Sequence, residues 1–74
     1  MIIFSKDEDR LINTDQILSI EIIGQDQNII MAYTTANTSL KLGEYPDKTS
    51  ALMTLKLIAD AFANRRQVFA LRDE

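Results

Sequence analysis

The sequence predicts an α+β fold: an antiparallel sheet of four to five short strands packed on one C-terminal helix, about 47–64, with a short terminal strand, about 67–71. Three observations lead to this prediction. Apolar and polar residues alternate through much of the first half of the chain, which is the period of a strand. After Pro46 the pattern changes to a helical period, and the β-prone run Gln-Val-Phe-Ala-Leu follows the helix.

Length and composition predict one domain, 1–74. The chain has 74 residues, of which 46% are hydrophobic, and only two glycines and one proline, so a disordered or low-complexity chain is excluded. A chain of this size is near the lower limit at which a single core folds alone, so little apolar surface can stay in water. We find no secretory signal and no apolar run of membrane-spanning length, and therefore expect a cytoplasmic protein without membrane contact.

The first two strands are expected to form a hairpin. The apolar segments 1–5 and 11–13 flank the charged run Lys-Asp-Glu-Asp-Arg, 6–10. We interpret its acidic residues, 7–9, as a solvated turn. A calcium loop of the EF-hand type needs oxygen ligands at alternate positions, a glycine and a distal glutamate, and this run lacks that spacing.

The segment 16–24 alternates as a half-buried strand. The two expected faces are Leu18, Ile20 and Ile22 on one side and Ser19, Glu21 and Ile23 on the other. In the polar connection that follows, Gly24 or Asn28 is expected to adopt a positive φ. The next strand, 29–35, is apolar on both faces, and we expect Tyr33 to point inward.

A tight turn with Asn37 in the left-handed region is predicted before the strand 38–45, which should direct Leu40 and Leu42 inward. Pro46 ends this strand because it has no N–H to donate. Asp47 is well placed to cap the helix that follows.

The predicted helix carries two apolar arcs, and its end is indicated by Asn64, Arg65 and Arg66. At about 100° per residue, the core arc comprises Leu52, Leu55, Ile58, Ala59 and Phe62, with Ala51 at its edge. The second arc, roughly opposite, comprises Met53, Leu57 and Ala61. If the first arc packs on the sheet, the second faces outward.

Three interpretations of the outer arc remain open. Its members are scattered exposed residues of the kind found on any surface, or the tail 67–71 folds back over them within the chain, or they form an interface with another molecule. We favour the interface, most simply with a second copy of the chain. The terminal strand can return to its own sheet or add to the open edge of a neighbour, as in a swapped dimer. The expected partner interface therefore comprises Met53, Leu57, Ala61, Val68 and Phe69.

The strand that ends in Leu42, Gly43, Glu44 and Tyr45, followed by the cap at Asp47, resembles small uncharacterised proteins of low-GC Gram-positive bacteria and their phages. The resemblance covers most of the chain. It implies the order of sheet and then helix, and it implies no activity.

The Leu-Gly-Glu-Tyr segment also has a structural interpretation. Gly43 lets a neighbouring backbone or aromatic ring approach closely. Tyr45 can pack its ring on the start of the helix while its hydroxyl stays in water. We favour this interpretation over a ligand site formed by Glu44 and Tyr45.

Catalysis is not expected, and neither is a metal or another cofactor. The sequence contains no cysteine and no histidine, which removes thiolate and imidazole chemistry. Carboxylates, lysine or tyrosine would have to replace them, and most of the carboxylates lie in expected turns or at the chain end. Glu21 is the exception, and we interpret it as a solvent-facing strand residue.

Charge argues against nucleic-acid binding. The net charge is −3, and residues 1–46 carry three basic and seven acidic side chains. A sheet that binds single strands needs exposed aromatic residues and a basic rim, so the acidic half is a poor platform. We therefore expect a non-catalytic protein–protein interaction module that forms a homodimer and also binds another protein, through a sheet edge or the outer helix face. The alternative is a nucleic-acid-associated accessory protein of phage or mobile-element origin.

Overall fold

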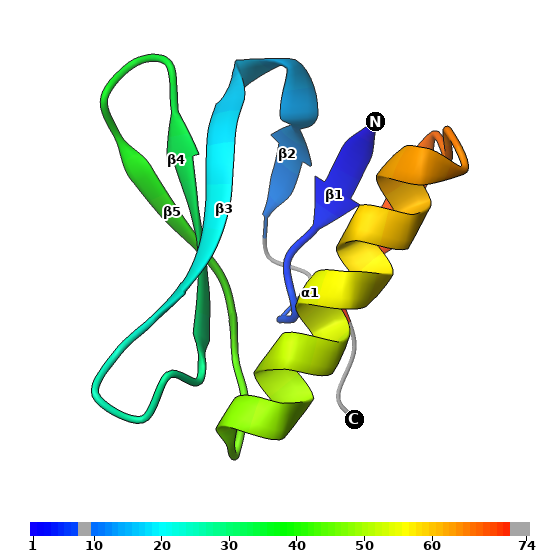
Figure 1. The fold of residues 1–74 in the computed structure, drawn as a ribbon. Coiled ribbons are helices and arrows are strands. Elements are labelled where there is room, and N and C mark those ends of the chain that lie inside the picture. The colour runs from blue at the N-terminus through cyan, green and yellow to red at the C-terminus, as the bar shows by residue number, and fades with distance from the viewer. Residues whose placement is uncertain (8–9, 72–74) are drawn as a thin grey trace.

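The computed structural model describes residues 1–7 and 10–71, and its α+β class is the predicted one (Figure 1). Glu8 and Asp9 of the expected hairpin turn and the charged tail, 72–74, lie outside the described residues. The elements in chain order are β1 (Ile2–Phe4), β2 (Leu11–Asn13), the short 3-10 helix η1 (Thr14–Gln16), β3 (Ile17–Ile23), β4 (Ile29–Thr34), β5 (Ser39–Glu44), α1 (Lys48–Ala63) and β6 (Val68–Ala70).

The described strands form two sheets of three strands. Sheet B is an antiparallel meander in the order β3-β4-β5. Its central strand alternates as predicted, because Ile30, Ala32 and Thr34 are buried and the residues between them are half-buried. Tyr33 is one of those residues, so it lies on the outer face and the expectation that it points inward is wrong. Leu42 is buried and Leu40 packs against the core, which confirms the predicted inner face of β5.

The predicted alternation of β3 fails in its first three residues, 17–19. The register between β3 and β4 shifts between Ile17 and Ser19, as in a β-bulge. Ile17 therefore packs against the core together with Ile20, while Leu18 is 73% exposed instead of pointing inward. Simple alternation cannot reveal a bulge, because one extra residue reverses the side to which the following residues point.

Positive φ values mark the two connections of sheet B. Gly24 has φ 100° and Asn37 has φ 66°, as predicted. Gln27, with φ 53°, takes the other left-handed position of the first connection, so Asn28 does not.

Sheet A has the order β2-β1-β6. β1 pairs with β2 in the predicted antiparallel hairpin, with Ile3 opposite Ile12. β6 pairs with β1 in parallel, with Phe69 beside Ile3. A parallel pair needs a long crossover connection. Here the connection between β1 and β6 contains all the other elements, from β2 to α1. The terminal strand thus joins a sheet of its own chain, and the swapped form of the same pairing stays a prediction.

A backbone hydrogen bond ties the sheets together, from the Lys6 N–H after β1 to the Leu42 carbonyl of β5, at 2.7 Å. The Thr35 N–H donates to the Gln16 carbonyl at 2.8 Å, which extends the pairing of β4 with β3. The two sheets share one core, and α1 packs against it on the side that the sheets leave uncovered (Figure 1). The buried core comprises Ile3, Ile12, Ile30, Ala32, Leu42, Tyr45, Ala51, Ile58 and Leu71.

Both ends of α1 are capped. The Asp47 carboxylate accepts a hydrogen bond from the Ser50 N–H at 2.8 Å, which confirms the predicted N-cap. At the other end Arg65 adopts a φ of 55°, and the Arg66 N–H donates to the Ala61 carbonyl at 3.0 Å. This is the hydrogen bond of a Schellman motif, so the helix ends where the sequence indicated.

The core face of α1 is rotated from the predicted one. Its buried residues are Ala51, Thr54, Ile58 and Ala61, whereas Leu52 is 39% exposed. Ala59 and Phe62, also assigned to the core, are exposed. Two features explain the difference. Small alanines let the helix approach the sheets closely, and the Thr54 hydroxyl can be buried because it donates to the Ser50 carbonyl at 3.0 Å.

The N-cap gives a pH-dependent prediction. The hydrogen bonds from the Ser50 backbone and side chain hold the pKa of Asp47 below its usual 3.8. A depressed pKa in the folded state means that the charged cap stabilises the fold above pH 4 and that this contribution is lost as the pH falls further. We expect Asp47→Ala to lower Tm by about 4 to 8 °C at neutral pH, as for the loss of an N-cap from a small domain.

The measurement is thermal unfolding followed by circular dichroism between pH 7 and pH 2. The difference between wild type and Asp47→Ala should shrink below pH 4. Asp47→Asn is the matched control, because asparagine caps well without titrating. A cap variant whose deficit stays constant over the whole pH range would contradict the assignment.

Candidate functional site

Exposed apolar side chains are the main surface feature of the described chain. Nine large hydrophobic residues are more than one third exposed, and contiguous patches of this kind mark interaction surfaces. They are Ile2, Phe4, Leu11, Leu18, Leu52, Met53, Leu57, Phe62 and Val68.

On α1, the predicted interface residues separate into two groups. Met53 is 52% exposed and Leu57 is 44% exposed, and these two residues, one turn apart, form what we call the free flank of the helix. Ala61 is 2% exposed and belongs to the buried arc, so the expectation that it faces outward is wrong. The tail does not cover Met53 and Leu57, because residues 68–70 pair with β1 instead.

On β6, Val68 and Phe69 also point in different directions. Val68 is 50% exposed and lies beside Ile2 in the parallel register. Phe69 lies beside the buried Ile3 and packs against the core. Val68 is therefore available to a partner, whereas Phe69 is largely occupied within the chain.

The outer face of sheet A is a surface that the sequence reasoning missed. The strand registers place its members on one side of the sheet: Ile2, Phe4, Leu11, Asn13, Val68 and Ala70. None of these six residues is charged. The available signal was the alternation in Ile-Ile-Phe and Leu-Ile-Asn, in which only the central residue of each triplet is buried.

The comparisons with known proteins give no relative. No family model, no curated protein and no solved structure matches the chain. Among the described residues, no helix is long and apolar enough to cross a membrane. The resemblance to small phage and Gram-positive proteins accordingly stays a prediction, and function has to be argued from the surfaces themselves.

A groove of about 460 Å³ runs between β3 and α1. On the strand side it is lined by four consecutive residues, Ile17 to Ile20, after Thr14. On the helix side its lining residues are Leu55, Ile58, Ala59 and Phe62. We call Leu55, Ala59 and Phe62 the groove flank of α1. At about 100° per residue, this flank and the free flank border the buried arc on opposite sides.

A second hollow of about 640 Å³ continues from the groove at the C-terminal end of α1. Thr14 and Phe62 line both hollows, which makes them neighbours. The second hollow adds two cationic side chains, Arg65 and Arg66, and one anionic side chain, Asp15. Among the described residues, neither arginine forms an ion pair.

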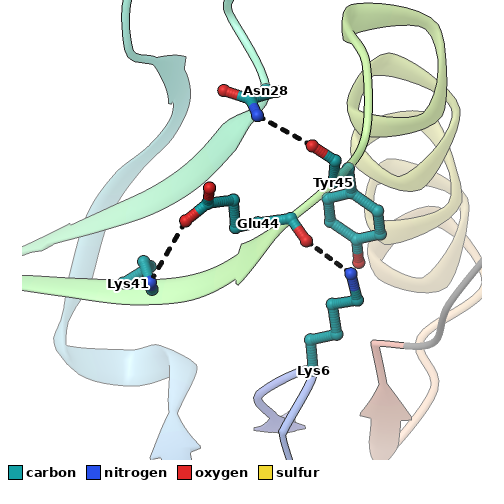
Figure 2. Close-up of polar contacts among 5 residues, drawn as sticks. All are labelled: Lys6, Asn28, Lys41, Glu44 and Tyr45. Carbon is teal, nitrogen blue, oxygen red and sulfur yellow. Dashed lines mark hydrogen bonds and ion pairs between the residues drawn. The ribbon is translucent and has the colours of Figure 1, made fainter.

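The Leu-Gly-Glu-Tyr segment has a structural arrangement (Figure 2). The Lys6 ammonium lies 4.3 Å from the centroid of the Tyr45 ring and donates a hydrogen bond to the Glu44 carbonyl. The Asn28 side-chain amide donates to the Tyr45 carbonyl at 2.7 Å. The Lys41 ammonium lies 3.5 Å from the Glu44 carboxylate. Lys6 thereby joins the end of β1 to the end of β5.

The structure agrees with the sequence interpretation of Gly43 and differs from that of the Tyr45 hydroxyl. A Cβ at Gly43 would lie 2.9 Å from the Lys6 Cβ and 3.2 Å from the Tyr45 ring, so glycine does allow a close approach. Tyr45, however, is only 2% exposed, and its hydroxyl oxygen is buried. The expectation that this hydroxyl stays in water is wrong, because the Tyr45 ring lies beneath the Lys6 ammonium and packs in the core.

Glu21 lies where the sequence suggested. Glu21 is exposed on the outer side of β3 and accepts a hydrogen bond from the Ser19 hydroxyl at 3.0 Å. In the described part of the chain, no three acidic side chains gather closely enough to hold a metal ion. The candidate sites are the apolar surfaces described above: the free flank, the outer face of sheet A and the groove.

Proposed function

We propose that this protein is a non-catalytic, cytoplasmic protein–protein interaction module that assembles as a homodimer. The observation that carries the proposal is the exposure of Met53 and Leu57 on the free flank of α1, together with Val68 on the outer face of sheet A. A chain this small buries barely enough apolar surface to fold, so side chains left half in water favour association.

The energies are compatible with a weak dimer. Full burial of a leucine, methionine or valine side chain contributes about 1.5 to 3 kcal/mol, and these three are already about half covered. Six such side chains in a twofold dimer would then contribute about 6 kcal/mol, which exceeds the association cost of about 4 to 15 kcal/mol only at the lower end of its range. The uncharged neighbours on sheet A, Ile2 and Leu11, add to the favourable side. We therefore expect weak association, which becomes detectable toward the upper end of the protein concentrations used in sedimentation.

The experiment is sedimentation equilibrium of the purified protein over a range of micromolar concentrations. Wild type should dimerise toward the upper end of this range, and Leu57→Asp should raise the dissociation constant at least about tenfold, because it places a carboxylate in an apolar contact. Lys56→Asp is the control, since it introduces the same side chain at the neighbouring, solvent-facing position.

Two results would contradict the proposal. One is a wild-type protein that stays monomeric at the highest concentration. The other is an equal effect of Leu57→Asp and Lys56→Asp, which would indicate that only charge was changed. Circular dichroism of each variant separates loss of assembly from loss of the fold.

A further inference from the structure

We propose that the groove between β3 and the groove flank of α1 binds an extended segment of a partner protein, in which apolar residues are followed by an acidic group. The segment would add to β3 as a fourth strand of sheet B. This inference goes beyond self-association and does not depend on it, since the free flank, with Met53 and Leu57, is the other side of the helix.

The free edge of β3 is the first element of the argument. β3 is an outer strand of sheet B, with β4 on one side and no further strand on the other among the described residues. Despite the bulge at its start, β3 has Ile17 and Ile20 on its core side and the exposed Leu18 on its outer side. Because the four consecutive residues 17–20 all line the groove, the backbone edge itself borders it. An edge of this kind offers N–H and C=O groups to an added strand.

The lining of the groove determines the character of the side chains that would enter it. Ile17, Ile20, Leu55 and Ile58 make its walls apolar, and Leu18, the most exposed large hydrophobic residue, stands at its rim. An added strand would direct every second side chain between β3 and α1. Those alternate residues should therefore be apolar and of moderate size, since the groove volume is about 460 Å³.

The cationic end of the groove, together with antiparallel pairing on β3, determines which end of the bound segment carries the acidic group. Asp15 and Thr14, which precede β3 directly, line the second hollow with Arg65 and Arg66, so the cationic end lies where β3 begins. The same end of the molecule carries η1 and the last turn of α1 (Figure 1). A strand that pairs antiparallel with β3 has its C-terminal end there. An acidic residue or a terminal carboxylate should accordingly follow the apolar stretch.

Charge complementarity supports an acidic group over a basic one. The two guanidinium groups outnumber the single carboxylate of Asp15, which leaves one positive charge at this end of a chain with a net charge of −3. Arginine binds carboxylates through paired hydrogen bonds, and neither arginine has an ion-pair partner among the described residues.

The experiment uses two labelled, end-blocked peptides of identical composition. The forward peptide is Val-Ser-Val-Thr-Ile-Asp-Glu and the reversed peptide is Glu-Asp-Ile-Thr-Val-Ser-Val. Fluorescence anisotropy should show that the forward peptide binds at least about tenfold more tightly, because only this peptide can pair antiparallel and place its carboxylates beside Arg65 and Arg66. The double variant Arg65→Glu, Arg66→Glu should remove that preference.

Matched variants test the location. Leu55→Asp should weaken binding of the forward peptide about tenfold or more, whereas Leu57→Asp, the same substitution on the free flank, should leave it unchanged. Leu55 is half-buried, so Ala59→Trp provides a second test that fills the groove from an exposed position. NMR shift changes on adding the peptide should concentrate in residues 17–20.

Several outcomes would overturn the inference. They are no binding of the forward peptide at millimolar concentration, equal binding of the two peptides, and binding that Ala59→Trp does not weaken. Binding of a small apolar probe such as decanoate, with neither peptide bound, would show a small-molecule pocket instead. Self-association broken by Ala59→Trp, again without peptide binding, would show that a second copy occupies the groove. Failure of the homodimer proposal would appear separately, in the Leu57→Asp sedimentation data.

Discussion

Ile3→Ala is expected to lower the free energy of unfolding by about 2 to 5 kcal/mol, the range for deleting a large aliphatic side chain from a packed core. Ile3 is fully buried at the centre of sheet A, between Ile12 of β2 and Phe69 of β6. Strands pair with β1 on both sides, so the backbone has little room to close the cavity. Because the whole stability of a small domain is about 5 to 15 kcal/mol, this loss is a large fraction of it.

The control is Ile2→Ala, which removes the same atoms from the adjacent residue of the same strand. Ile2 is 37% exposed on the outer face of sheet A, so its truncation should cost less than half as much. Urea unfolding of the two variants and wild type at low protein concentration measures the difference. Equal losses would mean that the two faces of β1 are assigned incorrectly.

Gly43→Ala is expected to destabilise the protein by about 1 to 3 kcal/mol, because the added methyl has no space. It would lie 2.9 Å from the Lys6 Cβ and 3.2 Å from the Tyr45 ring. Lys6 cannot retreat easily, since its backbone N–H is hydrogen-bonded to the Leu42 carbonyl at 2.7 Å. An unstrained glycine-to-alanine change usually stabilises by about 0.4 to 1 kcal/mol through the unfolded chain, and the clash outweighs that gain.

A double-mutant cycle identifies the cause. Gly43→Ala should cost less in a Lys6→Gly background, where the opposing Cβ is absent, than in a Lys6→Ala background, where it remains. Both backgrounds lack the ammonium over the Tyr45 ring, so that contact cancels in the comparison. Chemical denaturation of the six proteins gives the coupling energy. The same cost in both backgrounds would exclude the contact with Lys6 as the reason that glycine is needed.

Local signals in the sequence predicted the local structure well. Asp47 caps α1, Asn37 takes a left-handed turn position, and the helix ends at Ala63 with Asn64 as its C-cap. Each of these features depends on one residue type and its immediate neighbours, for example a side-chain oxygen within reach of a backbone N–H three residues later. Such short-range effects can be recognised without knowledge of the tertiary structure.

The wrong predictions concern features that depend on contacts between residues far apart in the sequence. The face that α1 buries depends on how closely it approaches the sheets, and Thr54 and Ala61 were therefore preferred to the larger Leu52 and Phe62. The parallel pairing of β1 with β6 leaves no trace in either strand, because a three-residue apolar triplet suits both directions. The groove requires β3 and α1 to be placed side by side, and for this reason the sequence indicated an open sheet edge but not which strand provides it.

The parallel pairing of β1 with β6 also constrains the order of events during synthesis. The meander of β3, β4 and β5 needs only neighbouring segments, and such local contacts form fastest. Sheet A can be completed only when residues 68–70 have left the ribosome, long after β1 has emerged. In the interval, the nascent chain presents a hydrophobic hairpin with an unpaired edge, and such an edge is open to chaperones and to misassembly.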